Sequence, residues 1–238
     1  MDVLFIIGES EFAASSLNLK MTDLAISAPE IDTNYIEVPG RNGEIDASEA
    51  LTGYPTYRNR TITATYDILD RNYAGWQGAY SEIAGKLHGR KGQMIFTDTD
   101  PNYYWKGRFS VSSNKINKIY SEVVVEMTAY PYKLEKYSSE ETAEWLWDDF
   151  DFETQYAHDP IYEIEVSGEK TVIVANNYMP FVPVFECSAE MELLHDNVRY
   201  SLPSGRSYNY DLVLKDIEET LVFYGNGTVS IIYRGGVL

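Results

Sequence analysis

The sequence predicts a mainly β chain with one helix and two domains. Apolar and polar residues alternate along most of the chain, which is typical of half-buried strands. The segment 73–88 follows a helical period instead, and an acidic run changes the composition near residue 138. A chain of 238 residues can form two small domains that each bury a core. We therefore expect an N-terminal domain over 1–137 and a C-terminal domain over 138–238, with a connector at about 138–160.

The first elements are strands. The segment 1–7 lacks the basic start of a signal peptide and is interpreted as a strand. In 61–68 the even positions are apolar and the odd ones polar, which predicts a second strand. A longer alternating strand over 119–129 needs an antiparallel partner, and 103–113 is the expected one. The turn between them is predicted at 114–115.

One helix is predicted at 73–88, because its apolar residues recur at helical spacing. The stripe consists of Trp76, Tyr80, Ile83, Ala84 and Leu87. Asn72 suits the N-cap, and Gly89 suits the left-handed residue that ends many helices. Lys86 and His88 fall in the last turn, where the helix dipole favours positive charge.

The connector is acidic and carries Trp145 and Trp147. Exposing that much aromatic surface is unfavourable. We therefore expect this run to pack against one of the domains or against another subunit.

The rest of the chain predicts an antiparallel β-sandwich, because short strands recur at intervals of roughly 8–12 residues. The expected strands are 162–166, 171–174, 198–202, 208–214, 221–224 and 229–233. A turn is predicted at 168–169. The sequence Gly-Asn-Gly at 225–227 predicts a hairpin between the last two strands.

Composition excludes several classes of function. The formal net charge is −18, so the chain lacks the basic surface of a sequence-specific nucleic-acid binder. The charge could simply confer solubility, or it could line a channel through which nucleic acid passes; both interpretations stay open. No apolar run approaches the roughly 20 residues of a membrane span. The single cysteine, Cys187, excludes an intramolecular disulfide and is expected to be a small core residue.

Catalytic and metal sites receive little support. Asp98 and Asp100 would share one face of a strand, as a hydrolase pair could, but we favour a turn in which they accept local backbone N–H groups. The acidic run 148–153 lacks the spacing of a calcium loop. The three histidines, His88, His158 and His195, match no metal or catalytic motif. We expect no enzymatic activity, no metal and no cofactor.

The loop at 38–44 is the strongest candidate contact site. Pro39 fixes φ, Gly40 and Gly43 permit unusual backbone conformations, and Asn42 favours a tight reversal. The loop could be a plain hairpin tip. It could also be a rigid contact loop in which Arg41 reaches a carboxylate of a neighbouring subunit.

Five motifs occur in an order that resembles the distal tail proteins of long-tailed bacteriophages. They are "VPGRNG" (38–43), "NRTITATYDI" (59–68), the Trp76 helix, "LHG" (87–89) and "DTDPNYYWKGRF" (98–109). The C-terminal "YGNGTVSIIYRGGVL" fits the galectin-like sandwich of that family more loosely. The resemblance implies an N-terminal β-sandwich with one helix and an extended hairpin, followed by a galectin-like antiparallel β-sandwich.

The resemblance also implies a function and partners. It implies a hub at the distal end of the virion tail, made in the bacterial cytoplasm and assembled as a hexameric ring. The ring would link the tail tube protein to the tail-associated hub protein and to receptor-binding or baseplate proteins. Candidate interface residues are Pro39, Gly40, Arg41, Asn42, Gly43, Trp76, His88, Trp145 and Trp147. The alternative is a carbohydrate-binding sandwich on the virion that contacts cell-wall glycan, and a hydrolase is a third possibility.

Overall fold

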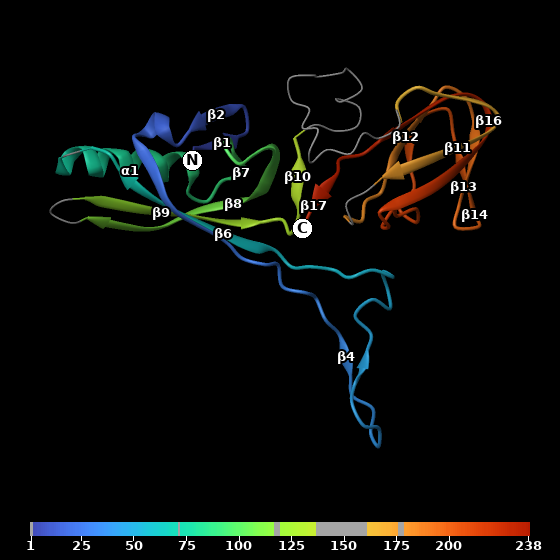
Figure 1. Cartoon of the computed structure of the whole chain (residues 1–238), viewed down its shortest axis with the longest axis horizontal. Coiled ribbons are helices and arrows are strands. Elements are labelled where there is room, and N and C mark those ends of the chain that lie inside the picture. The colour runs from blue at the N-terminus through green and yellow to red at the C-terminus, as the bar shows by residue number, and fades with distance from the viewer. Residues whose placement is uncertain (1, 71, 117–119, 137–160, 176–178) are drawn as a thin grey trace. The chain divides into compact units, whose positions relative to one another are not determined.

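The computed structural model describes the chain except for residues 1, 71, 117–119, 137–160 and 176–178 (Figure 1). The chain folds into two compact units, Met1–Lys133 and Leu134–Leu238. Antiparallel strands dominate both units, and the described residues contain a single α-helix. The predicted fold class is therefore confirmed. The predicted connector lies outside the described residues, so the boundary at 137/138 stays a prediction.

The first unit is built on one antiparallel sheet with the strand order β2-β1-β7-β8-β9-β6-β3. In chain order its strands are β1 (Val3–Ile7), β2 (Ser10–Ala13), β3 (Leu19–Ile26), β6 (Arg60–Ile68), β7 (Lys91–Phe96), β8 (Asp100–Ile116) and β9 (Ser121–Ala129). Alternate residues of β6 are buried, as the sequence predicts, and β9 follows the same rule. A short 3₁₀ turn, η1 (Ser15–Leu17), precedes β3.

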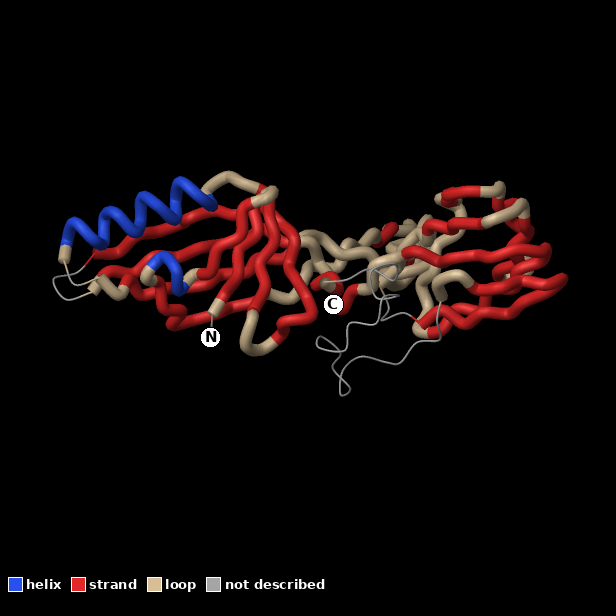
Figure 2. Tube along the Cα trace, turned by 90° about the horizontal axis from the view of Figure 1, so that it is seen from above, coloured by secondary structure: helices blue, strands red, loops and turns tan. Residues whose placement is uncertain are grey.

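Helix α1 (Tyr73–Leu87) covers one face of this sheet (Figure 2). The Asn72 side chain accepts a hydrogen bond from the Gly75 N–H at 2.6 Å, so the predicted N-cap is confirmed. Gly89 has a φ of +77°, which confirms the left-handed residue beyond the helix end. Trp76, Ile83 and Leu87 are buried in the core beneath the helix.

The predicted turn at 114–115 is wrong. Strand β8 continues to Ile116, and Asn114 and Lys115 pair with Val123 and Glu122 of β9. The ladder shifts register between Val111 and Ser113, where β8 has one extra residue. This bulge interrupts the alternation that marks a strand, so the sequence predicts its end too early.

An arm leaves the sheet between β3 and β6. We call residues 27–59 the arm; it extends away from the sheet and ends in a small hairpin of β4 (Tyr35–Ile36) and β5 (Ile45–Asp46) (Figure 1). The extended hairpin that the resemblance implies is present in this unit.

The second unit contains a sheet with the order β14-β13-β16-β12-β15, and β11 pairs with the other edge of β16. The strands are β11 (Ile164–Ala175), β12 (Val184–Cys187), β13 (Met191–His195), β14 (Val198–Leu202), β15 (Gly205–Tyr208) and β16 (Glu218–Ile232). The short strands β10 (Lys133–Glu135) and β17 (Gly236–Val237) pair with each other.

Two predicted turns of this unit are wrong, because both lie inside long strands. The segments 168–169 and 225–227 pair with each other across the ladder, with Gly168 opposite Gly225. The φ values of Gly225 and Gly227 are +148° and +143°, which side chains rarely adopt. These glycines shape a continuous strand and do not reverse the chain.

The glycines of β16 mark the point where the strand changes partner. On one edge, Val222–Tyr224 pairs with β13, whereas Val229–Ile232 pairs with β12. Met191 packs over both glycines, and a Cβ at Gly225 would lie 3.0 Å from its Cγ. The two groups of strands enclose one hydrophobic core.

The predicted strand 208–214 is also wrong beyond its first residue, because β15 ends at Tyr208. The Asn209 side chain accepts a hydrogen bond from the Asp211 N–H at 2.9 Å, which closes a turn. Leu212 and Leu214 are buried nevertheless, so their alternation reflects core contacts in a loop.

A buried pair joins two strands of this unit. His195 Nε2 lies 2.8 Å from Glu219 Oε2, and both side chains are almost fully enclosed. Burial raises the pKa of Glu219, but hydrogen bonds from the Asp216 N–H, His195 and the Lys215 N–H outweigh it and hold this pKa below its ordinary value.

Replacing Gly107 with alanine should destabilise the first unit by at least about 2 kcal/mol, because the new Cβ would lie 2.2 Å from the Thr128 carbonyl oxygen. The control is Gly78→Ala, at an exposed helical position with open space. It should stabilise the first unit by up to about 1 kcal/mol. Urea unfolding followed by tryptophan fluorescence measures both changes. Equal effects of the two substitutions would contradict the close packing of β8 on β9.

The lowered pKa of Glu219 predicts acid sensitivity of the second unit. A carboxyl whose pKa is lowered on folding stabilises above its ordinary pKa of 4.5, and this stabilisation disappears as the pH falls through the folded-state value. Glu219→Gln should cost about 1–3 kcal/mol at pH 7 and flatten the loss of stability below pH 4.5. The exposed neighbour substitution Glu218→Gln should change neither. Denaturant unfolding at a series of pH values tests this, and an unaltered acid response in Glu219→Gln would refute it.

Candidate assembly surface

The arm exposes apolar side chains that the described residues of its own unit do not cover. Every arm residue is described, and none of them belongs to a hydrophobic core. Ile31, Tyr35, Ile36 and Leu51 are 56, 55, 47 and 100% exposed. Apolar groups concentrated on one projecting element are typical of a contact surface.

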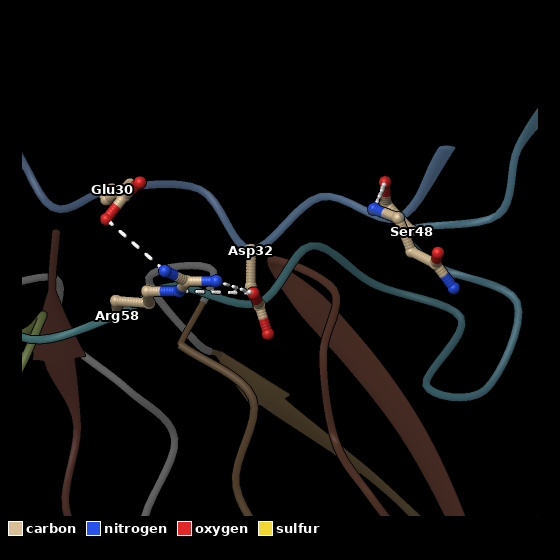
Figure 3. A network of polar contacts seen from close by, with 5 residues as sticks. Glu30, Asp32, Ser48 and Arg58 are labelled. Carbon is tan, nitrogen blue, oxygen red and sulfur yellow. Dashed lines mark hydrogen bonds and ion pairs between the residues drawn. The ribbon is translucent and has the colours of Figure 1, made fainter. Parts of the chain in front are cut away.

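Polar contacts hold the two legs of the arm together. The Asp32 N–H donates to the Thr56 carbonyl and the Arg58 N–H donates to the Glu30 carbonyl, at 2.9 and 2.8 Å. The Arg58 guanidinium pairs with Asp32 at 3.0 Å and with Glu30 at 3.7 Å (Figure 3). These pairs are exposed, so they set the course of the chain more than they stabilise it.

Near the tip, a hydrogen-bonded turn adds further polar contacts between the two legs. The Ser48 hydroxyl and N–H both donate to Asp46, and these hydrogen bonds hold the pKa of that carboxyl below its ordinary value. The same hydroxyl accepts the Asn34 N–H at 2.8 Å, which ties the two legs beside the β4–β5 hairpin.

The predicted contact loop forms the end of the arm. Pro39, Gly40, Arg41, Asn42 and Gly43 are all exposed. Gly40 and Gly43 have φ values of +81° and +78°, and a Cβ at either would meet nothing within 4 Å. Glycine is therefore needed here for backbone conformation and not for space. The Arg41 side chain has no partner among the described residues.

Aromatic residues join the arm to the sheet. Tyr57 on the returning leg packs edge-on against Tyr132 at 5.9 Å, and Tyr132 contacts Tyr130 at 5.8 Å. Burial and the neighbouring tyrosines raise the pKa of Tyr132 to about 12. The base of the arm is thus anchored, while its tip is free of the core.

Arg60 is a site residue that the sequence reasoning missed. It is the first residue of β6 and belongs to the buried face of that strand. A signal was present, because position 60 continues the apolar even-numbered series 62, 64, 66 and 68. A charged residue at a position of the apolar series predicts a buried charge.

The other predicted interface residues are scattered. Trp76 is 5% exposed and donates its indole N–H to the Asp70 carbonyl, so the structure does not support its assignment to a contact surface. His88 is exposed, and its Nδ1 accepts the Val111 N–H at 3.1 Å. Trp145 and Trp147 lie outside the described residues.

The two carboxylates considered for catalysis each have a structural partner. Asp98 lies in a turn and accepts the Asp2 N–H at 2.9 Å, whereas Asp100 pairs with Lys133 at 2.6 Å. Within the described part of the chain, no group of three potential metal ligands occurs. Burial raises the pKa of the Cys187 thiol, which disfavours the nucleophilic thiolate. None of the described helices is both long and apolar enough to cross a membrane.

Comparison with known proteins identifies the fold. No family model and no curated protein matches the sequence. Among solved structures, the chain is similar to the Dit protein (gp 19.1) of SPP1, described as a paradigm of the hub adsorption apparatus in phages that infect Gram-positive bacteria. The identity is 12% and the TM-score 0.61, over 99% of both chains. A chain of the phage p2 baseplate also matches over the full length, with 6% identity and a TM-score of 0.39, which is too low to support an argument.

The likeness to SPP1 Dit spans both units, so it is not a local match of one sandwich. It confirms the fold expected from the ordered motifs. At this identity the likeness establishes the fold. The chain has the fold of a phage distal tail protein.

The exposed tip predicts where a protease cuts first. Trypsin should cleave after Arg41 faster than after Arg58, whose backbone N–H is hydrogen-bonded to the opposite leg. Arg41→Gln should remove the early cut and leave the later fragments unchanged. Fragment masses over a time course measure the order, and earlier cleavage at Arg58 would show that the arm is not organised as described.

Proposed function

We propose that this chain is a structural subunit of a phage tail. In this proposal it forms the hub at the distal end of the tail, where it joins the tail tube to the tail-associated hub protein and to the receptor-binding or baseplate proteins. The observation that carries the proposal is the likeness to SPP1 Dit across 99% of the chain. The chain acts as a scaffold and not as an enzyme, and it resides in the virion after synthesis in the bacterial cytoplasm.

The proposed hub is a closed ring of six copies. The arm supports this arrangement, because its exposed apolar residues need a surface that its own unit does not offer. Contact between the arm of one copy and the body of the next is a heterologous interface, which closes into a ring when the rotation matches. Arg41 at the tip would meet a carboxylate on a chain with 37 acidic and 19 basic residues.

A second candidate function is glycan binding by the second unit. Tyr208 and Tyr210 are 58 and 75% exposed, and aromatic faces bind sugar rings. The two rings meet at 73°, however, so they do not share a plane on which a sugar could lie. Binding of host wall polysaccharide that is lost in Tyr210→Ala would support this function, and absence of binding by the wild type would eliminate it.

The ring predicts a definite mass. Six copies of 27.1 kDa give ~163 kDa by light scattering. A variant in which Asn-Gly replaces residues 37–44 would close the β4–β5 hairpin with a two-residue turn. It should stay a monomer, because the contact loop is gone.

The circular dichroism spectrum and urea midpoint of that variant serve as controls. Both should match those of the dissociated wild-type monomer, since the loop contributes to neither core. A shortened variant that still forms a ~163 kDa species would refute the role of the arm, and a wild type that remains monomeric at every concentration would count against the ring.

A further inference from the structure

Arg60 is a buried cation stacked on an aromatic ring. Arg60 is 7% exposed, and its guanidinium carbon lies 4.9 Å from the centre of the Trp105 ring. This geometry is a cation–π contact. It lies in the first unit at the base of the arm, where β6 begins and pairs with the end of β9 at Ala129.

The buried guanidinium has no anionic partner in the part of the chain that the structure describes. The Arg60 side chain donates no hydrogen bond to any described residue, and its Nε is enclosed without an acceptor. Burial alone lowers its pKa. A buried charge is costly unless it is paired and hydrogen-bonded.

Other arginines of the described chain contrast with Arg60. Arg58 and Arg199 pair with carboxylates, and Arg108 and Arg234 donate to backbone carbonyls. The buried arginine is therefore left unpaired, whereas several more exposed ones are satisfied. None of the described residues supplies the missing acceptor.

The arm carries acceptors of the matching charge. Glu37 and Glu44 flank the contact loop, both are exposed, and neither has a partner among the described residues. The arm extends away from the sheet on which Arg60 lies, so the tip does not reach the Arg60 of its own chain (Figure 1). A second copy can present the same tip to it.

We propose that Arg60 is a docking site for a carboxylate from a second copy of this chain, supplied by Glu37 or Glu44 of the neighbour's arm. The pairing rests on the proposed ring and names the contact at the base of each arm. A planar guanidinium held on Trp105 presents its N–H groups in a fixed direction, which suits bidentate binding of a carboxylate. The free subunit holds a costly charge that assembly neutralises.

Analytical ultracentrifugation over a concentration series tests the pairing in the full-length chain. Arg60→Met and the double variant Glu37→Gln, Glu44→Gln should each weaken assembly at least about tenfold. The combination of all three should weaken it no further than either, because both remove the same contact. Arg60→Lys should restore part of the affinity, and Arg90→Met, which removes an exposed arginine of the same unit, should have no effect.

Urea unfolding of the dissociated monomer supplies a second readout. Arg60→Met should leave the midpoint unchanged or raise it, because an apolar side chain replaces an unpaired charge. A lowered midpoint would reveal a partner within the monomer and overturn the pairing. A wild-type ring that forms equally well with Arg60→Met would overturn the pairing and leave the ring intact. A wild type that never assembles would overturn both.

Discussion

The apolar side chains of the arm cannot be buried by the unit that carries them. The arm is a narrow pair of chain segments, and a two-stranded ribbon has too little thickness to enclose a core. Fully burying a side chain of the size of isoleucine contributes roughly 1.5–3 kcal/mol. Four exposed residues of this kind, Ile31, Tyr35, Ile36 and Leu51, therefore represent a contact energy that the isolated chain does not realise. That unrealised energy is the physical argument behind the proposal that the chain is one part of an assembly.

The remainder of the first unit gives the arm a fixed base. The seven-stranded path of the sheet ends at β3, and the arm connects this edge strand to its neighbour β6. Helix α1 and the alternating faces of β6 and β9 bury the core, so the position of Arg60 on Trp105 is set by a packed surface. The tyrosines at the base extend that surface to the last residues of the arm. A rigid base and an uncovered tip fit an element that reaches toward another molecule.

Sequence patterns were informative where a single local rule decides the structure. The period of the helix, its cap at Asn72 and the left-handed Gly89 were all predicted, because each depends on nearby residues. The long strands were harder. Gly168, Gly225 and Gly227 are local turn signals, yet they pair across the sheet and let Met191 pack on the strand. The bulge in β8 likewise depends on pairing with β9, which no short window of sequence contains. The turn at Asn209 is local, and it was missed because Leu212 and Leu214 continue a strand-like alternation.

In the candidate site, too, features set by local sequence were predicted and those set by distant contacts were not. The loop at the arm tip was predicted from proline and glycine chemistry, and the structure places all five of its predicted residues on the surface. Trp76 is buried in the core of the first unit, and an aromatic residue in a helical stripe is equally compatible with a core and with a contact, so its interface role stays a prediction. Arg60 was missed, because its contact with Trp105 joins residues that are far apart in the sequence.

The most direct test of the arm as a subunit contact is photo-crosslinking in a mixed assembly. A photoreactive amino acid replaces Asn42, and light and heavy isotopic forms of the chain are mixed before they assemble. Mass spectrometry then shows which isotopes each cross-linked pair of peptides contains. The account predicts pairs that join the arm tip of one isotope to the first unit of the other. Cross-links confined to a single isotope would show that the tip folds back on its own chain, and would contradict it.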